Sequence, residues 1–209
     1  SDVCSSDLRG ERAEKLDAEI ARAATQVEKL AKELAGTRRA AAKKLAAAVT
    51  KELKDLGFAH GSFGVQLTPV AVAGPRGMDE IEFSFAPNVG EPARPLRQIA
   101  SSGEMSRVML ATKVVLAEHD RVTVLVFDEI DANVGGEMGT AIGEKLRAVA
   151  GGHQVICITH LPQVAAQGDC HYVVNKTVQG GRTNTGIAAV TGDGRAEELA
   201  RMLGGRSEE

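Results

Sequence analysis

The sequence contains no tryptophan, one tyrosine and five phenylalanines among 209 residues, and only three cysteines. With so few aromatic side chains, any hydrophobic core has to be aliphatic. Three scattered cysteines, an odd number, exclude a disulfide framework and suit a reducing cytosol. No apolar run reaches the ~20 residues of a membrane-spanning helix. No secretory signal pattern opens the chain either, so we expect no membrane partner.

What is present is the composition of a globular protein. Hydrophobic residues make up 43% and charged residues 25%, and 25 Lys and Arg against 28 Asp and Glu give a net charge of −3. This balance argues against disorder and against a polycationic tail. The length allows one domain, or a smaller domain with an extended arm. Because the first residue is Ser and the first methionine is Met78, we interpret the chain as part of a longer protein.

The first residues do not fit the pattern that follows them. Residues 1–8, SDVCSSDL, resemble the translation of a sequencing adapter, and a short polar tail is the alternative. We therefore predict that residues 1–10 form a non-native or disordered tail outside the fold.

Residues 11–56 are predicted to form a coiled-coil arm helix, because apolar side chains recur at alternating spacings of four and three residues. These side chains are Leu16, Ile20, Ala23, Val27, Leu30 and Leu34. The spacing is interrupted at Gly36-Thr37, and the stripe then resumes with Leu45, Val49, Leu53 and Leu56. Gly57 supplies a stop. Nothing else in the chain is long enough to pair with this stripe. Its partner is expected to be a second copy of the chain or a helix upstream of it.

Residues 57–209 are predicted to form an α/β domain. Alternating apolar residues predict an antiparallel hairpin over 63–85, and a proline-rich loop follows at 86–97. Two apolar runs, 122–127 and 154–159, are typical of strands buried on both faces of a parallel sheet. The other elements expected are helices at 103–118, 137–150, 162–167 and 196–203, and strands at 172–175 and 187–190.

Residues able to do chemistry gather at three points. Ser101–Glu104 lies where a loop enters a helix, where backbone N–H groups stabilise a phosphate, although an ordinary N-cap is the alternative. Asp128 and Glu129 follow the first strand, where Asp128 can hold Mg²⁺ and Glu129 can deprotonate a water molecule. The alternative is that both are solvated acids without a chemical role. His160 follows the second strand and could donate to a phosphate, although a lone histidine is more often structural.

In this order the motifs resemble the carboxyl-terminal lobe of ABC-type ATPase heads. The amino-acid sequence resembles the RecN family of SMC-like bacterial DNA repair proteins over about residues 11–205. The segments that carry the resemblance are IASSGEMSRVMLA, VFDEIDANVGG, ITHLPQVAAQGD, EELARMLGG and the hairpin segment PRGMDEIEFSF. The resemblance implies a mostly parallel sheet flanked by helices and preceded by a long coiled-coil helix.

The resemblance also implies roles for individual residues. The signature loop, which would contact the ATP held by an opposing head, consists of Ser101, Ser102, Gly103 and Glu104. Ser102 stands where a glycine is usual. Asp128 would bind Mg²⁺, Glu129 would be the catalytic base and His160 the switch histidine. Asp131 and Asn133 belong to the loop that crosses between paired heads, so they are predicted to bind the cofactor.

A P-loop, G-x-x-x-x-G-K-[ST], is absent from the sequence. In the family it lies in the amino-terminal half, before the ascending arm helix. The missing P-loop and the missing partner of the apolar stripe therefore have one explanation, a fragment that lacks its amino-terminal half. The isolated fragment is expected to be inactive.

The resemblance implies a complete protein that is a cytoplasmic, nucleoid-associated ATPase of DNA double-strand-break repair and recombination. It would form a homodimer through ATP-bridged heads and bind DNA. The alternative is a non-catalytic coiled-coil interaction or DNA-binding module with a degenerate head. A cohesin-type head is a third possibility. The amino-acid sequences around His160 and at Met202–Gly205 argue against it. A P-loop upstream of this reading frame would discriminate the first two.

Overall fold

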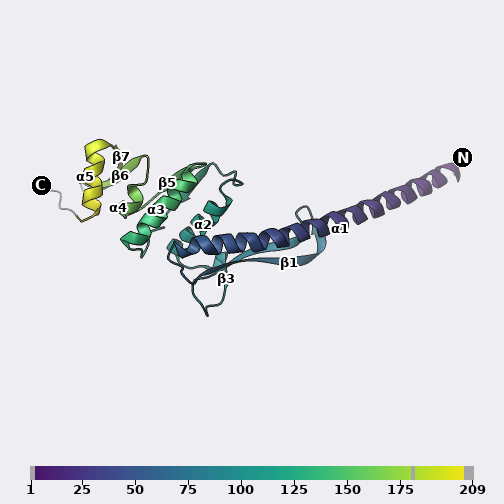
Figure 1. Cartoon of the computed structure of the whole chain (residues 1–209). Coiled ribbons are helices and arrows are strands. Elements are labelled where there is room, and N and C mark those ends of the chain that lie inside the picture. The colour runs from purple at the N-terminus through teal and green to yellow at the C-terminus, as the bar shows by residue number, and fades with distance from the viewer. Residues whose placement is uncertain (1–2, 180–181, 205–209) are drawn as a thin grey trace. The chain divides into compact units, whose positions relative to one another are not determined.

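A computed structural model describes residues 3–179 and 182–204 (Figure 1). The elements are α1 (Val3–Lys54), β1 (Ser62–Gly74), β2 (Gly77–Ala86), β3 (Arg94–Pro95), the 3₁₀-helix η1 (Leu96–Gln98), α2 (Ser102–Leu116), β4 (Val124–Phe127), α3 (Gly136–Ala150), β5 (Gln154–Cys157), α4 (Pro162–Ala165), β6 (His171–Gln179), β7 (Arg182–Val190) and α5 (Gly192–Met202). The described residues form two compact units. The first unit contains the chain up to Ala46 with Gly64–Ser84, and the second contains Ala47–Phe63 with the residues from Phe85 on.

Helix α1 is continuous over 52 residues, about 78 Å at 1.5 Å per residue. It passes through the interruption in the stripe without a break, and the Thr37 hydroxyl donates to the Leu34 carbonyl at 2.8 Å. The helix ends at Lys54, and Gly57 has a φ of +88°, as expected of a stop. Residues 3–10, predicted to be a non-native or disordered tail, continue the same helix. Whether they are native stays a prediction.

In the first unit, the hairpin of β1 and β2 lies along α1 (Figure 1). Ala31 and Ala35 are the buried helix residues there, and Arg38 pairs with Asp79 of β2 at 3.8 Å. The larger residues of the predicted stripe are exposed, namely Leu16, Ile20, Val27, Leu30 and Leu34. Small residues one position along from the stripe therefore face the hairpin. Within the described residues the stripe is uncovered from Leu16 to Leu30, whereas Leu34 lies beside Gly77 of the hairpin.

The second unit contains the parallel strands β4 and β5, paired from Val124 with Gln154 to Phe127 with Cys157. Leu125 and Phe127 are buried, whereas Val126 is 62% exposed. The expectation of strands buried on both faces is therefore wrong for the described part of the chain. Helix α3 packs against β5 and α2, and the opposite face of this two-stranded sheet meets no described element that buries it.

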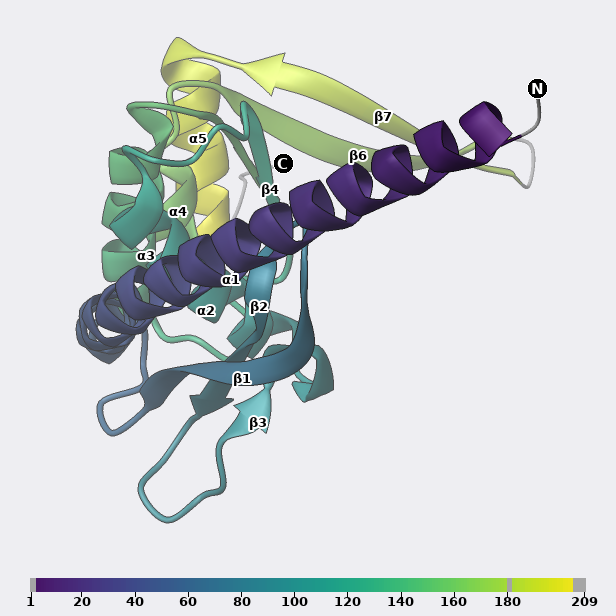
Figure 2. The ribbon, with the colours of Figure 1, turned by 90° about the vertical axis from the view of Figure 1, so that its right-hand side faces the viewer.

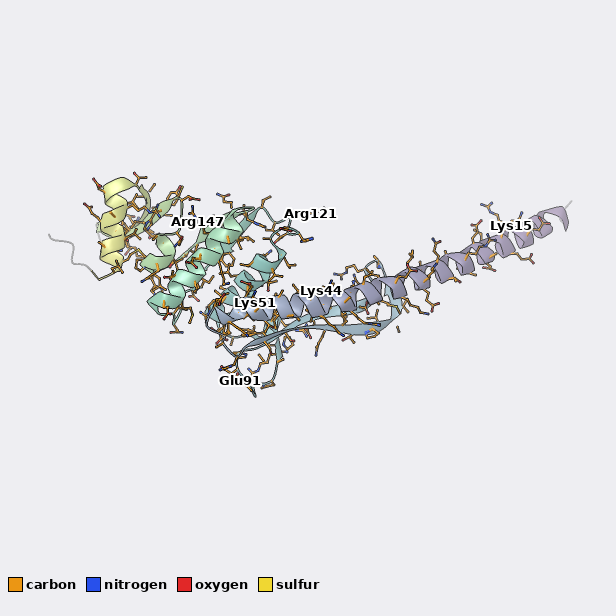
Figure 3. The ribbon with its side chains drawn as sticks, in the orientation of Figure 1. Lys15, Lys44, Lys51, Glu91, Arg121 and Arg147 are labelled. Atoms are coloured by element: carbon orange, nitrogen blue, oxygen red, sulfur yellow. The ribbon has the colours of Figure 1, made fainter. Side chains whose placement is uncertain are left out.

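Two packing details position the segment after β5. Gly143 on α3 leaves room for α4, because a Cβ atom there would lie 2.8 Å from the Gln167 side chain and 3.1 Å from the Gln163 carbonyl. Arg147 of α3 (Figure 3) donates to the Gln167 carbonyl at 2.9 Å. Arg195 of α5 donates to the carbonyls of Ala165, Ala166 and Gly168. The short helix α4 is thus held from both sides.

Strands β6 and β7 form an antiparallel pair, with His171 opposite Val190 (Figure 2). Both strands are longer than predicted, and they form a sheet separate from β4 and β5. The α/β class is confirmed, but β4 and β5 are the parallel pair of the described residues. None of the helices described is both long enough and apolar enough to cross a membrane.

Candidate functional site

The start of α2 is a capped helix N-terminus. The Ser101 hydroxyl accepts the Glu104 N–H at 3.3 Å, and the Ser101 carbonyl accepts the Met105 N–H at 3.0 Å. Glu104 lies in the first turn, where a negative charge is favourable. The N-cap interpretation of this motif is confirmed. Binding of an anion there stays a prediction.

Helix α2 packs directly on the loop that follows β4. A Cβ atom on Gly103 would lie 3.0 Å from the Glu129 carbonyl oxygen and 3.0 Å from the Ala132 side chain, so any larger residue there would have to displace the loop slightly. Ser106 donates its hydroxyl to the Asp128 carbonyl at 2.9 Å. The predicted signature loop and the strand-end acids, 24 or more residues apart in the sequence, are therefore neighbours.

Arg107 is the residue that sequence reasoning missed. Its Nη1 donates to the Ile130 and Ala132 carbonyls, each at 3.2 Å, and its guanidinium lies 5.1 Å from the centre of the Phe58 ring. Burial lowers the pKa of Arg107 from its ordinary value, and the nearby Glu104 opposes this. A usable signal was its position four residues after Gly103, on the same face of the helix.

The loop from Asp128 to Gly135 contains two residues in the left-handed region, Glu129 with φ +55° and Asn133 with φ +59°. Asparagine tolerates this conformation better than glutamate does, and such strain costs about 1–3 kcal/mol where surrounding contacts hold it. The Ser102 hydroxyl donates to Oε2 of Glu129. The loop therefore holds the predicted base against Ser102 of the predicted signature loop.

Asp131 and His160 also meet, although they are 29 residues apart. Oδ2 of Asp131 lies 3.2 Å from Nδ1 of His160 and accepts the Thr159 hydroxyl at 2.5 Å. Asp131 is 1% exposed, so its carboxylate faces the end of β5 from inside the chain. Asn133 and Asp128 are exposed. All of the predicted site residues lie in the second unit, around the loop after β4.

Carboxylates give this edge of the sheet a negative potential. The pKa of the Cys157 thiol is raised to about 12, first by burial and then by Asp131 and Asp128. Among the described residues, no group of three or more His, Cys, Asp or Glu side chains could hold a metal alone. One exposed carboxylate, completed by waters and phosphate oxygens, is nevertheless the usual protein contribution to Mg²⁺ binding. The residues present fit a nucleotide-bound Mg²⁺ through Asp128.

Comparison with known proteins decides the relationship. The chain is 43% identical over 194 residues to the DNA repair protein RecN of Xylella fastidiosa strain Temecula1, which covers 92% of the chain. It is 44% identical over 198 residues to RecN of Treponema pallidum, and 45% identical over 191 residues to RecN of Streptomyces coelicolor. This chain is homologous to part of RecN.

The chain spans only about a third of the RecN relatives: 35% of the first two and 33% of the third. The matching region is the carboxyl-terminal part of RecN. No family model matches the chain. The predicted resemblance to RecN is confirmed, whereas the roles of individual residues stay predictions.

Solved structures show the same fold as this RecN homologue. The Smc head domain with a coiled coil and joint from Pyrococcus yayanosii aligns with a TM-score of 0.63 and 18% identity, over 94% of this chain and 36% of that one. The Pyrococcus furiosus Smc head domain with an extended coiled coil, bound there to the C-terminal domain of ScpA, aligns with a TM-score of 0.55 and 19% identity. It covers 95% of this chain and 46% of that one. The predicted SMC-type head with a coiled-coil helix is confirmed as a fold.

Proposed function

We propose that this chain is the carboxyl-terminal lobe of a RecN-type DNA repair ATPase head. It would complete an ATP site only with an amino-terminal lobe that carries the P-loop, and with a second head. The observation that supports this most strongly is the convergence of Ser102, Glu129 and His160 on one loop in a chain homologous to RecN.

In the complete site, each motif has one task. Mg²⁺-bound ATP supplies the phosphoryl group to be cleaved. Asp128 would hold the metal ion, Glu129 would deprotonate the attacking water, and His160 would contact the γ-phosphate or that water. The signature loop, Ser101 to Glu104, offers the N-terminal N–H groups of α2 to the ATP of the opposing head. Asn133, exposed on the loop, would face that head.

The uncovered face of β4 and β5 supports docking of an amino-terminal lobe. Its exposed side chains are Val124, Val126, Ile156 and Ile158. A contiguous apolar surface of this kind marks an interaction site on a soluble protein. An amino-terminal lobe would pack on this exposed face and bury its apolar side chains. The arm helix of that lobe would pair with the exposed stripe of α1 in a coiled coil.

The dimer and its surroundings follow from the same proposal. Two heads would close around two ATP molecules, and hydrolysis would reopen them on DNA. The complete protein would act in double-strand-break repair and recombination, in the cytoplasm and at the nucleoid.

The test is reconstitution of the chain with the P-loop half of a RecN protein. Hydrolysis should be negligible for the 209-residue chain alone, and it should appear and respond to DNA in the complex. Glu129→Gln should lower kcat by about 10²–10⁴-fold and leave ATP trapped in closed dimers. Glu91→Gln, on an exposed loop of the same unit, is the matched control and should leave kcat unchanged.

Two results would contradict the proposal. Turnover at an ordinary enzymatic rate by the chain alone would show that no second lobe is needed. Unchanged turnover in Glu129→Gln would remove the assigned base. A complex that assembles and binds DNA without any hydrolysis would favour the non-catalytic interaction module instead.

A further inference from the structure

Four polar groups converge on a single oxygen atom, Oδ2 of Asp131. It accepts the Thr159 hydroxyl at 2.5 Å, the His160 N–H at 2.9 Å and the Leu161 N–H at 3.2 Å. The fourth group is Nδ1 of the His160 ring, also 3.2 Å away. All four come from three consecutive residues, so this one carboxylate organises the turn that leaves β5.

The Asp131 carboxylate is buried and therefore depends on these hydrogen bonds. Asp131 is 1% exposed, and a buried carboxylate is costly unless it is well hydrogen-bonded. The donors of residues 159–161 meet that requirement, and the Thr159 hydroxyl in turn accepts the Leu161 N–H at 3.0 Å. The turn and the carboxylate therefore stabilise each other, and neither can move without exposing a polar group to a poor environment.

The backbone on either side of Asp131 is held from α2. Arg107 donates to the carbonyls of Ile130 and Ala132, the two neighbours of Asp131 in the chain, each at 3.2 Å. A continuous path of contacts thus runs from α2 through the loop after β4 to His160.

The His160 ring has little else to fix it, because its side chain is 69% exposed. The Asp131 oxygen 3.2 Å from Nδ1 favours a proton on that nitrogen, because an unprotonated Nδ1 would turn its lone pair toward a negative charge. In the neutral ring, Nε2 is then the unprotonated nitrogen. One contact would set both the direction of the ring and its tautomer.

We propose that Asp131 is a positioning residue that fixes the orientation and the tautomer of His160, rather than a ligand of the nucleotide as its motif predicts. The structural part of this proposal stands on the geometry of this chain alone. Its consequence for ATP hydrolysis rests on the proposed function above.

The structural part is tested by ¹⁵N NMR of the 209-residue chain with labelled histidines. The neutral His160 ring should carry its proton on Nδ1. In Asp131→Ala the shifts should move to the Nε2-protonated form. Asp169→Asn, an exposed acid that pairs with Arg147 at 3.2 Å, is the matched control and should leave His160 unchanged.

A neutral His160 protonated on Nε2 in the unsubstituted chain would overturn the proposal without any variant, and so would unchanged shifts in a folded Asp131→Ala chain. If Asp131→Ala does not fold, Asp131→Leu, which keeps the approximate size of the side chain but has no acceptor, replaces it with the same expected change.

The functional part is tested in the complex with a P-loop half. Asp131→Ala, or Asp131→Leu if the former does not fold, should lower kcat about tenfold while KM for ATP changes less than twofold. In a His160→Ala background, the same substitution should have little further effect, because the group it positions is gone. Equal losses in both backgrounds would indicate a merely structural role and overturn the proposal. If the unsubstituted complex hydrolyses no ATP, the proposed function fails, and the NMR result still decides the role of Asp131 in the fold.

Discussion

Leu30 and Leu53 belong to the same helix and to the same apolar stripe, yet Leu30 is 55% exposed and Leu53 is 0% exposed. Leu30 lies in the first compact unit, where the hairpin covers Ala31 and Ala35 instead. Leu53 lies in the second unit, whose elements bury it together with Val49 and Leu56. The comparison teaches that apolar periodicity identifies the face of the helix that packs against a partner. It does not say whether the partner is part of the chain.

The largest expected effect sharpens this contrast. Leu53→Ala should lower the free energy of unfolding by about 2–5 kcal/mol, because it leaves a cavity in a packed core. Leu30→Ala removes an exposed side chain and should change it by about 0.5 kcal/mol or less. Urea unfolding of both variants measures the difference. Equal losses would mean that the stripe is already buried in the isolated chain.

The second effect concerns binding of the amino-terminal half, which would bury Leu30 and so remove the difference in exposure between Leu30 and Leu53. If a helix of the amino-terminal half pairs with the stripe, Leu30→Ala should weaken binding of that half about tenfold, or ~1.4 kcal/mol. Titration calorimetry with the purified half measures the affinity. Thr37→Ala, on the same helix but outside the stripe, is the control. An affinity unaffected by Leu30→Ala would place the partner of the arm elsewhere.

The smallest effects compare the ion pairs of the two units. Lys145, with a mostly buried side chain, contacts Glu52 at 2.5 Å and Asp55 at 2.9 Å. Lys32 forms an exposed pair with Glu28, at 2.5 Å along α1. Lys145→Met should cost about 1 kcal/mol or less, and Lys32→Met should leave the unfolding midpoint unchanged. A larger loss for Lys32→Met than for Lys145→Met would reverse the comparison.

The Lys145 contribution should also depend on pH in one direction. Partial burial alone would lower the pKa of Lys145, but hydrogen bonds and charges of Glu52 and Asp55 outweigh it and raise the pKa above the ordinary 10.5. Because the folded state holds this proton more tightly, the contribution is fully present below the ordinary pKa. It is lost as the pH rises through the folded pKa. The stability difference between the parent and Lys145→Met, followed into alkaline solution, should therefore shrink above pH 10.5.

Much of the fold was predictable because its signals are local. The helix expected at 103–118 is Ser102–Leu116, and the apolar run at 122–127 contains β4. Small polar residues before a helix predicted the Ser101 cap, and Gly57 predicted the stop. The joining of β6 and β7 into a separate antiparallel sheet was not predictable, because strand pairing depends on residues far apart in the sequence.

The site divides in the same way. The motifs by themselves predicted Asp128, Glu129 and His160 at the carboxyl ends of two strands, because an apolar run followed by polar residues is a local pattern. Arg107 escaped prediction, since its partners are carbonyl groups more than 20 residues away. The motif assigned Asp131 to the nucleotide, and only its burial showed that the carboxylate serves the turn after β5.

The sequence alone therefore determined where the helices and strands lie, which residues form the apolar stripe, and which side chains carry chemistry. Only the tertiary structure decided which apolar faces are covered by other elements. It also brought the Ser102 hydroxyl to the Glu129 carboxylate, and the N–H and hydroxyl donors of residues 159–161 to one oxygen of Asp131. The physical reason is range. Helical and strand periodicity act between residues a few positions apart, whereas burial and hydrogen bonding depend on elements brought together from distant parts of the chain.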